Sequence, residues 1–397
     1  MDAADFSAVL SEVRRFVRDR VVPLEAEIDE TDEMPADIRE AAKKMGLFGF
    51  ALPEEYGGLG LSMLEEAQLM FELGYTTPSL RSMFGTNNGI AGHVLMVGGT
   101  EEQKAHWLPR IASGEVLASF ALTEPEAGSD PSTLTTRAHP DDGGTSRSIG
   151  AESGGEWVIN GAKRYITNAP LADVFMVFAR TDPDAPRTRG ISTFLVPAGT
   201  PGLTVAPKDH KMGQFGAWTA DVFFDDVRVP ASALVGGDDG LNRGFSTAMG
   251  CIAHGRVHIS ALMVGMAERL VDESVAYAST RKQSGKLIGS FQLVQGLIAD
   301  SQTDYYAGRA TVLEAARAFD AGTDTKIGPS CTKYFASEMV WRVADRAVQV
   351  HGGAGYMRGV AVERFYRDAR LFRIYEGTSQ IQQVIIAKAL LGEAARG

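Results

Sequence analysis

Apolar residues in the first part of the chain recur every three or four positions, the spacing that places them on one face of an α-helix. Two such stripes comprise Phe6, Leu10, Val13, Phe16 and Val17, and then Leu64, Ala67, Met70, Phe71 and Leu73. A turn rich in Pro and Gly, Leu52–Gly60, lies between them. The pattern predicts a helical N-terminal domain over residues 1–115.

The pattern changes between residues 116 and 235. Four segments there are rich in Val, Ile, Phe and Thr and are bounded by Gly, Pro, Asp or Asn: EWVINGAKRYITNA, DVFMVFAR, GISTFLVPA and TADVFFDDVRVP. β-Branched and aromatic residues favour strands, and the bounding residues favour turns. This region predicts a central antiparallel β domain over residues 116–235.

Helical spacing returns from residue 236 to residue 397. The apolar stripes predict four long helices: Val257–Thr280, Phe291–Phe319, Cys331–Val350 and a last one from about Thr378 to Leu391. Four antiparallel helices of this length form a bundle. The predicted fold class is α+β, with a helical N-terminal domain, a central antiparallel β domain and a C-terminal four-helix bundle over residues 236–397. The order of elements differs from the strand–helix alternation of a Rossmann fold.

Composition narrows the classes of function. The 397 residues suffice for two or three domains, and their net charge of −11 argues against a nucleic-acid-binding protein, which needs a basic surface. No apolar run reaches the roughly 18 residues of a membrane helix, and the acidic start MDAADFSAVL lacks the features of a signal peptide. The two cysteines, Cys251 and Cys331, are too few for a disulfide framework or a cysteine metal site. We therefore expect a cytoplasmic protein without membrane insertion.

Two motifs suggest ligand sites but do not fit them well. His254 and His258 are four residues apart on a predicted helix and could face a metal ion, but Gly255 stands where the zinc-protease pattern needs Glu. Packing or surface roles are favoured for both, and no metal is expected. The glycine-rich segment Gly352–Arg358 follows a predicted helix rather than a strand, so it does not fit a dinucleotide-binding turn.

Two further segments have alternative interpretations. ALTEPEAGSD (Ala121–Asp130) ends a predicted strand in a tight turn, whose N–H and hydroxyl groups would suit a flavin ring or a pyrophosphate. A plain β-turn would have the same composition. In RIYEGTSQIQ (Arg373–Gln382), Thr378 can cap a helix. Glu376 beside it either interacts with the helix dipole or acts as a general base whose pKa is raised by burial.

With these motifs in this order, the sequence resembles the acyl-CoA dehydrogenase family over essentially its whole length. The matching segments are PEEYGGLG, ALTEPEAGSD, RYITNA, RKQSGK, QVHGGAGYMRGVAVERFYRDAR and RIYEGTSQIQ. The resemblance implies an oxidoreductase that binds FAD non-covalently and forms a homotetramer, built as a dimer of dimers. It implies α,β-dehydrogenation of an acyl-CoA thioester to the trans-2-enoyl-CoA, as in fatty acid β-oxidation and other lipid metabolism. Electrons would pass to electron-transfer flavoprotein.

The resemblance also assigns roles near the substrate. Glu376 matches the catalytic base of straight-chain members, which removes the α-proton while the β-hydrogen leaves as hydride to the flavin N5. Isovaleryl- and long-chain-type members carry the base on the first bundle helix, where this chain has Gly255. The residues that match substrate contacts are Ser129, Arg256, Tyr375 and Gly377.

Two groups of residues match FAD contacts in the family. The first surrounds the flavin ring and the pyrophosphate near the base: Phe120, Leu122, Thr123, Ser129, Tyr165, Thr167, Thr378 and Gln380. Within it, Thr167 matches the hydrogen-bond partner of N5. The second group matches contacts to the adenine and phosphate end of FAD in the neighbouring subunit: Arg281, Gln292, Gln349, Gly352 and Gly353. The resemblance thus implies that dimerisation completes each site.

Two positions depart from the family pattern, and two other functions remain open. Tyr165 replaces a Trp, which bears on electron transfer to the partner, and Ser284 replaces a Phe, which bears on the intersubunit FAD contact. One alternative is an acyl-CoA oxidase, although oxidases usually carry a further C-terminal domain and the length of 397 residues favours the dehydrogenase. The other is an inactive or flavin-poor member that acts as a partner subunit, against which the intact base and FAD motifs argue. The sequence does not identify the acyl chain.

Overall fold

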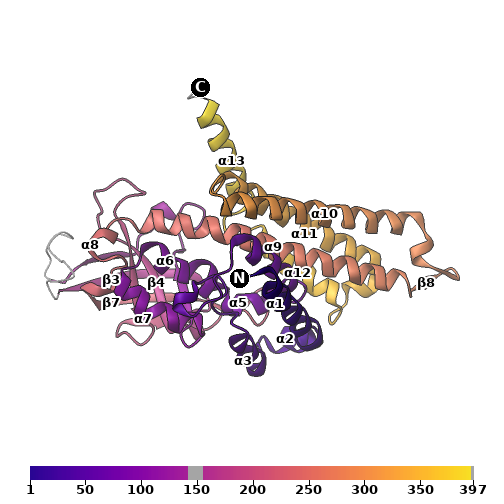
Figure 1. Ribbon diagram of the computed structural model, residues 1–397, viewed down its shortest axis with the longest axis horizontal. Helices are drawn as coiled ribbons and strands as arrows, with labels where there is room; N and C mark the ends of the chain where they lie inside the picture. Colours follow the sequence, from indigo (N-terminus) through magenta and orange to yellow (C-terminus); the bar gives the residue numbers. More distant parts are fainter. Residues whose placement is uncertain (142–154, 395–397) are drawn as a thin grey trace.

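The computed structural model describes residues 1–141 and 155–394. Helices form the N-terminal part of the chain, a seven-stranded sheet follows, and long helices complete the C-terminal part. Figure 1 shows the sheet at one end of an elongated molecule, the long helices at the other end, and the N-terminal helices beside both. The predicted succession of helical, β and helical regions is confirmed. Within the described residues, no helix is long and apolar enough to cross a membrane.

At the starts of α1, α4, α5 and α7, the side chain of the N-cap residue accepts free backbone N–H groups. Ser62 and Glu65 form a reciprocal capping box at the start of α4, and Thr100 and Gln103 form another at α7. The elements are α1 (Ala3–Arg15), η1 (Phe16–Val21), η2 (Val22–Leu24), α2 (Glu25–Thr31), α3 (Ala36–Lys44), η3 (Glu54–Tyr56), α4 (Met63–Leu73), α5 (Pro78–Gly85), η4 (Thr86–Ile90), α6 (Ala91–Gly98) and α7 (Glu101–Ala112).

The central sheet has the strand order β1-β4-β2-β3-β7-β6, with β5 paired to β4. Its strands are β1 (Ala118–Ala121), β2 (Arg137–Pro140), β3 (Glu156–Thr167), β4 (Val174–Arg180), β5 (Ile191–Pro197), β6 (Leu203–Val205) and β7 (Thr219–Pro230), with short 3-10 turns η5 (Pro131–Thr133), η7 (Ala169–Leu171) and η8 (Ala231–Ala233). The sheet is mixed rather than wholly antiparallel, since β4 runs parallel to β1 and β2. Strands β1, β2 and β4 all run in one direction, and β3 runs in the opposite direction.

Strands β4 and β5 are buried on both faces, which explains why their sequences are continuous apolar runs. On one face, Phe175 and Phe194 pack with Trp157 inside the sheet. On the other face, Met176 and Phe178 pack in a second core that includes residues of α6, α7 and α9. The sheet is therefore fixed to helices from both the N-terminal and the C-terminal regions.

The C-terminal region contains five long helices rather than the four predicted. They are α9 (Gly244–Ala278), α10 (Gln292–Asp320), α11 (Ile327–His351), α12 (Ala361–Phe372) and α13 (Ser379–Ala394). The short helix α8 (Gly237–Gly240) precedes them, and between them lie the hairpin β8 (Lys282–Gln283) and β9 (Lys286–Leu287) and the turns η9 (Ile288–Ser290) and η10 (Gly352–Tyr356). Helix α12 was missed, although Val362, Phe365, Ala369 and Phe372 follow helical spacing.

The predicted bundle differs in its membership. Helix α13, which we expected to be its fourth helix, packs on α11 and then projects from the body of the molecule (Figure 1). The fourth position is taken by α4, which packs against both α9 and α10. Two glycines allow this close approach, because a Cβ on Gly74 would collide with Leu262 O and one on Gly265 would collide with Phe71 O. The N-terminal helices and the bundle consequently share one hydrophobic core.

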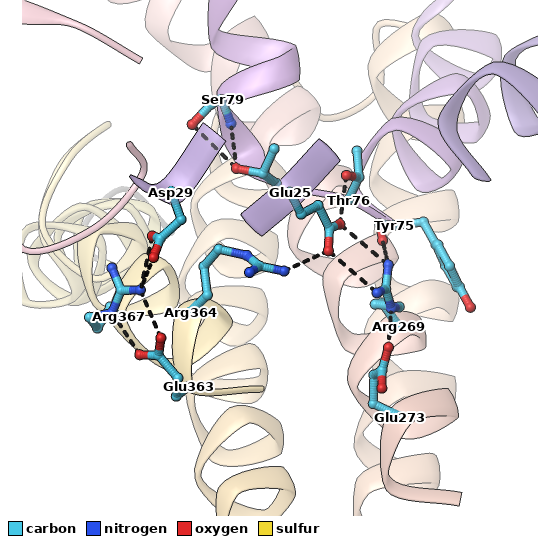
Figure 2. Close-up of polar contacts among 11 residues, drawn as sticks. Glu25, Asp29, Tyr75, Thr76, Ser79, Arg269, Glu273, Glu363, Arg364 and Arg367 are labelled. Atoms are coloured by element: carbon cyan, nitrogen blue, oxygen red, sulfur yellow. Dashed lines mark hydrogen bonds and ion pairs between the residues drawn. The ribbon is translucent and has the colours of Figure 1, made fainter. Parts of the chain in front are cut away.

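A buried ion cluster ties α2 to α9 and α12, as Figure 2 shows. Glu25 of α2 is 2% exposed and accepts hydrogen bonds from Arg364 at 2.6 Å and from Arg269 at 3.3 and 3.4 Å. Thr76 Oγ1 donates to the same carboxylate at 2.7 Å, so each Glu25 oxygen has two donors. One turn later on α2, Asp29 pairs with Arg367 at 2.9 Å. These contacts fix α12 relative to α2 and α9.

Replacing Glu25 with Gln should destabilise the fold strongly. The substitution leaves the buried Arg364 guanidinium without its anion and leaves Arg269 with Glu273 alone. Breaking comparable buried pairs costs about 3–5 kcal/mol. Glu27→Gln is the matched control, because Glu27 is exposed on the same helix, and it should change stability by less than about 0.5 kcal/mol. Urea unfolding of both variants at equal protein concentration measures the difference. Equal unfolding midpoints for the two variants would contradict the role of the cluster.

Candidate active site

The turn between α12 and α13 presents Glu376. Its backbone is left-handed at Glu376, with φ 56°, and at Gly377, with φ 84°. Ser379 N donates to Arg373 O at 3.1 Å and closes the turn. As predicted, Thr378 caps α13, since its Oγ1 accepts a hydrogen bond from Ile381 N at 3.2 Å. A left-handed conformation is unfavourable for a residue with a side chain, so the surroundings must hold Glu376 in place.

The carboxylate of Glu376 faces α9 at Gly255. A Cβ on Gly255 would lie 3.4 Å from Glu376 Oε2 and 3.4 Å from Ile90 Cγ2. The absence of a side chain at Gly255 therefore leaves space directly beside the carboxylate. The alternative position for a base, considered from the sequence, lies opposite Glu376 rather than elsewhere in the molecule.

Burial raises the pKa of Glu376 above the ordinary value for a glutamic acid, and nearby cationic groups oppose the rise. These groups are Arg81, Arg256, Lys333 and His254. Arg256 also donates from Nε to Glu376 O at 3.4 Å. Arg81 and Lys333 were not predicted, because burial of a single charged residue has no periodic signature in the sequence. Both are nevertheless buried, Arg81 at 8% exposed and Lys333 at 0%.

The two histidines of α9 are buried and have separate protein partners. His254 Nε2 lies 3.1 Å from Glu66 Oε1, and His258 Nδ1 lies 2.9 Å from Arg81 Nη2. Burial and the charge of Arg81 lower the pKa of His258, so its ring accepts the hydrogen bond in neutral form. Each histidine ring is paired with a different protein side chain. This favours the packing interpretation over a metal ion bound by both rings.

The segment Ala121–Asp130 forms a tight turn after β1, and Glu124 organises it. The buried Glu124 carboxylate accepts hydrogen bonds from Thr135 N at 2.6 Å, Thr136 N at 2.9 Å and Lys163 Nζ at 2.8 Å. Burial opposes ionisation of Glu124, but the ion pair with Lys163 and these hydrogen bonds together lower its pKa to about 2. The turn is thereby attached to β3, an arrangement that the sequence did not reveal.

The residues expected around the flavin ring lie at the ends of β1 and β3, which are separated in the sheet by β4 and β2. Phe120 is in β1, followed by Leu122 and Thr123, while Tyr165 and Thr167 end β3. Arg164 N donates to Thr123 O at 2.8 Å, which joins the two segments. A register shift of β3 against β7 and a φ of 57° turn Tyr165 outward, where it is 59% exposed.

This surface fits a flat ring system that carries hydrogen-bond acceptors. It offers the exposed aromatic ring of Tyr165 and, close by on β3, the hydroxyl of Thr167. Arg164 Nε is buried and has no hydrogen-bond partner among the described residues. A buried N–H without a partner is unfavourable, so an acceptor from a bound group would stabilise it.

The second group of expected FAD contacts lies at the far end of the long helices. Arg281 follows α9, Gln292 begins α10, and Gln349, Gly352 and Gly353 mark the end of α11. All five are exposed. From Gly255 to the end of α9 the helix extends about 35 Å at 1.5 Å per residue, and Figure 1 shows β3 and the β8–β9 end of the molecule far apart. Within one chain, the residues of each group lie near one another, but the flavin-ring group and the Arg281 group lie far apart.

The remaining predicted residues border the two turns. Gln380 is exposed at the start of α13, and Tyr375 and Gly377 flank Glu376. Ser129 is exposed and lies three residues before Ser132, the first residue along the chain that lines a cavity of about 660 Å³. The polar residues lining this cavity include Ser132, Thr133, Thr135, Arg137, Arg180 and Arg187. Arg187 lies 3.8 Å from Asp130, so the cavity adjoins the turn that ends at Asp130.

Three family models match the chain in succession. They are the acyl-CoA dehydrogenase N-terminal domain over residues 4–115, the middle domain over residues 119–227 and the C-terminal domain over residues 242–391. Together they span the helical region, the sheet and the long helices described above.

Individual relatives are similar over almost their whole length. An acyl-CoA dehydrogenase of Bacillus subtilis is 37% identical over 380 residues, which cover 96% of each chain. The CarC subunit of the caffeyl-CoA reductase–Etf complex of Acetobacterium woodii is 37% identical over 365 residues, which cover 92% of each chain. The solved structure of butyryl-CoA dehydrogenase from Megasphaera elsdenii superposes with a TM-score of 0.89 at 31% identity, covering 97% of this chain and 98% of that one.

Proposed function

Because the chain belongs to the acyl-CoA dehydrogenase family, we propose that it is an FAD-dependent oxidoreductase that converts an acyl-CoA thioester to the trans-2-enoyl-CoA. The observation that carries the proposal is the placement of Glu376. Its carboxylate lies on a left-handed turn, faces the open side of α9 at Gly255 and is surrounded by buried cations. A carboxylate in such surroundings suits a general base.

Glu376 is the residue that acts directly on the substrate. Glu376 takes the α-proton of the thioester onto its carboxylate, and the electron pair of that C–H bond forms the new C=C bond as the β-hydrogen departs with its own pair. FAD, when bound, supplies the acceptor for that hydride. The elevated pKa of Glu376 makes it a stronger base than an exposed glutamate, and the four cations limit the rise in pKa and so favour the ionised form. Arg256 and Tyr375 border the space in which the thioester would lie.

FAD would be held by residues of two subunits. Phe120, Tyr165 and Thr167 form the surface that fits the flavin ring, with Leu122, Thr123, Ser129, Thr378 and Gln380 near it. The exposed group of Arg281, Gln292, Gln349, Gly352 and Gly353 is too distant to serve the same cofactor in one chain. We assign it to the FAD of a neighbouring subunit.

The cavity next to Ser129 supports binding of the CoA end of the substrate. Its lining includes three arginines and several hydroxyls. Arginine binds phosphate oxygens with charge-assisted hydrogen bonds, and CoA carries several phosphate groups. Arg137 and Arg187 are exposed, while Arg180 donates to backbone carbonyls of the surrounding loops.

Exposed apolar side chains support the homotetramer. They gather in the C-terminal region and include Leu293, Tyr306, Tyr356, Met357, Leu390 and Leu391. Helix α13 projects from the body of the chain (Figure 1), and its apolar residues Leu390 and Leu391 are uncovered. Large exposed apolar surfaces of this kind are typical of protein interfaces. We place the subunit contacts on α10, η10 and α13.

The electron partner that we propose is electron-transfer flavoprotein. The similarity to CarC, a subunit of a reductase–Etf complex, supports this partner. The same relative is a reductase, and the base described here would donate its proton in that reverse direction. The proposal also includes a place in fatty acid β-oxidation and a cytoplasmic location, in line with two free cysteines.

Glu376→Gln should retain acyl-CoA binding yet fail to reduce the flavin. Gln has nearly the same shape, but it cannot accept the α-proton, so a base contribution of about 10²–10⁴-fold should be lost. The measurement is anaerobic bleaching of the flavin by a panel of acyl-CoAs, with Glu314→Gln, an exposed position on α10, as a control. Adding Gly255→Glu should restore part of the rate, because a carboxylate there would lie beside position 376. Bleaching by Glu376→Gln at the wild-type rate would place the base elsewhere.

Arg281→Ala should weaken FAD binding only through the oligomer. It removes a charge-assisted contact to phosphate, worth about 1.5–3 kcal/mol, from a residue remote from Glu376 in its own chain. Flavin content and oligomeric state are measured together by size-exclusion chromatography with absorbance detection. Lys282→Ala, the exposed neighbour, is the control. A monomer with full flavin occupancy would refute the shared site.

Substrate-reduced enzyme should reoxidise quickly with electron-transfer flavoprotein and slowly in air. The reason is that the proposed acceptor is a protein partner rather than oxygen. Stopped-flow absorbance follows flavin reoxidation under both conditions, and a peroxide assay is run in parallel. Rapid peroxide formation during turnover would instead identify an oxidase.

A further inference from the structure

The backbone carbonyls of the Glu376 turn accept hydrogen bonds from three separate helices. Lys333 of α11 donates to Gly377 O at 2.6 Å. Gln382 of α13 donates to Glu376 O at 2.9 Å and to Gly377 O at 3.1 Å. Arg256 of α9 approaches Glu376 O at 3.4 Å. Together these donors compensate for the unfavourable left-handed conformation of the turn.

Helix α11 also holds both ends of the turn. Glu338 accepts hydrogen bonds from Arg373 Nε at 2.8 Å and from Ser379 Oγ at 2.6 Å. Lys333 lies one and a half turns earlier on the same helix and contacts the middle of the turn. The two residues differ in one respect that matters for chemistry, since Lys333 places a positive charge near the Glu376 carboxylate and Glu338 does not.

Lys333 is completely buried and has no carboxylate within ion-pair distance among the described residues. Its ammonium group makes its hydrogen bond to a neutral carbonyl, Gly377 O. An ammonium ion removed from water needs a compensating anion or strong hydrogen bonds. The positive charge of Lys333 acts instead on the carboxylate of Glu376 and favours its ionised form.

We propose that Lys333 is a positioning residue for α-proton abstraction: its ammonium group holds Gly377 O, so that Glu376 stays in its left-handed conformation, and its charge keeps the Glu376 carboxylate ionised. The proposal rests on the function proposed above, with Glu376 as the base. Lys333 acts through Glu376 and need not touch the substrate.

The pH dependence follows from the groups that face Glu376. They are Arg81 of α5, Cys251, His254 and Arg256 of α9, Lys333 of α11 and Tyr375 of the turn. Burial raises the pKa of Glu376 and the cations lower it, so removal of one cation raises it further. The deprotonated base then forms only at higher pH. Burial lowers the pKa of Lys333 itself to about 8, so its charge acts mainly below that pH.

The principal test compares Lys333→Met with Lys333→Gln and Glu338→Gln in the FAD-loaded enzyme. The rate of anaerobic flavin reduction is measured from pH 5 to 9 with the most active member of a saturated C4–C16 acyl-CoA panel. Lys333→Met should slow reduction about 10–100-fold, the loss typical of a misplaced reacting group, and should move the acid limb to higher pH. Lys333→Gln retains a donor for Gly377 O, so it should recover part of the rate while the limb stays displaced.

Glu338→Gln is the matched control, because it weakens the ends of the turn without removing a cation. It should lower the rate while the acid limb stays at its wild-type pH. An unshifted limb in Lys333→Met would overturn the proposal. If the wild-type flavin is reduced by no acyl-CoA of the panel, the proposed function fails before any variant is compared.

A flavin-independent measurement covers the case in which Lys333→Met loses FAD. The unfolding free energies of wild type, Lys333→Met, Glu376→Gln and the double variant form a thermodynamic cycle. Lys333→Met should cost less stability when Glu376 is already Gln, because the ammonium–carboxylate attraction is then absent. Additive effects of the two substitutions would overturn the electrostatic part of the proposal.

Discussion

The buried carboxylate of Glu25 is the constraint on which the placement of the active-site turn depends. It binds Arg269 of α9 and Arg364 of α12, and its two oxygens have four donors in all (Figure 2). A buried carboxylate is costly unless its hydrogen-bonding capacity is filled, so an arrangement of α2, α9 and α12 that lost these donors would be strongly unfavourable. The Glu376 turn follows the end of α12, so the contacts that fix α12 also fix the position of the turn.

Helix α9 connects this cluster to the rest of the site. Its first turn packs so tightly on β5 that a Cβ on Gly244 would approach Thr193 Oγ1 to 2.8 Å. Further along, it offers the gap at Gly255 beside the base, then the close crossing with α4 at Gly265, and then Arg269 of the ion cluster. One helix thus sets the distances between the sheet, the base and the N-terminal helices. The far end of the same helix carries Arg281 away from its own Glu376, so a site that needs both must draw on two chains.

The sequence predicted elements better than it predicted contacts. The segment TADVFFDDVRVP corresponds to β7, because burial on one face produces alternation that is visible in the sequence. Helix α12 also has a periodic pattern, but its charged residues obscured it, and two of them, Arg364 and Arg367, turn inward to acids of α2. The motif containing Glu376 was identified by resemblance, whereas Lys333 and Glu124 were missed. Their importance lies in partners that are distant in sequence, and no local pattern encodes such partners.

The opposing effects on Glu376 explain why the site contains so many buried cations. A base must be ionised before the substrate arrives, yet burial raises the pKa of this carboxyl and so favours its protonated form. An entering acyl chain displaces water and increases that tendency further. The positive charges of Arg81, Arg256 and Lys333 oppose this protonation without exposing the carboxylate to water. The three residues lie on three different helices, α5, α9 and α11, which hold them in place. His254 adds to this field while its own ring is held by Glu66. The site therefore combines a carboxylate made basic by desolvation with a rigid positive field that preserves its charge.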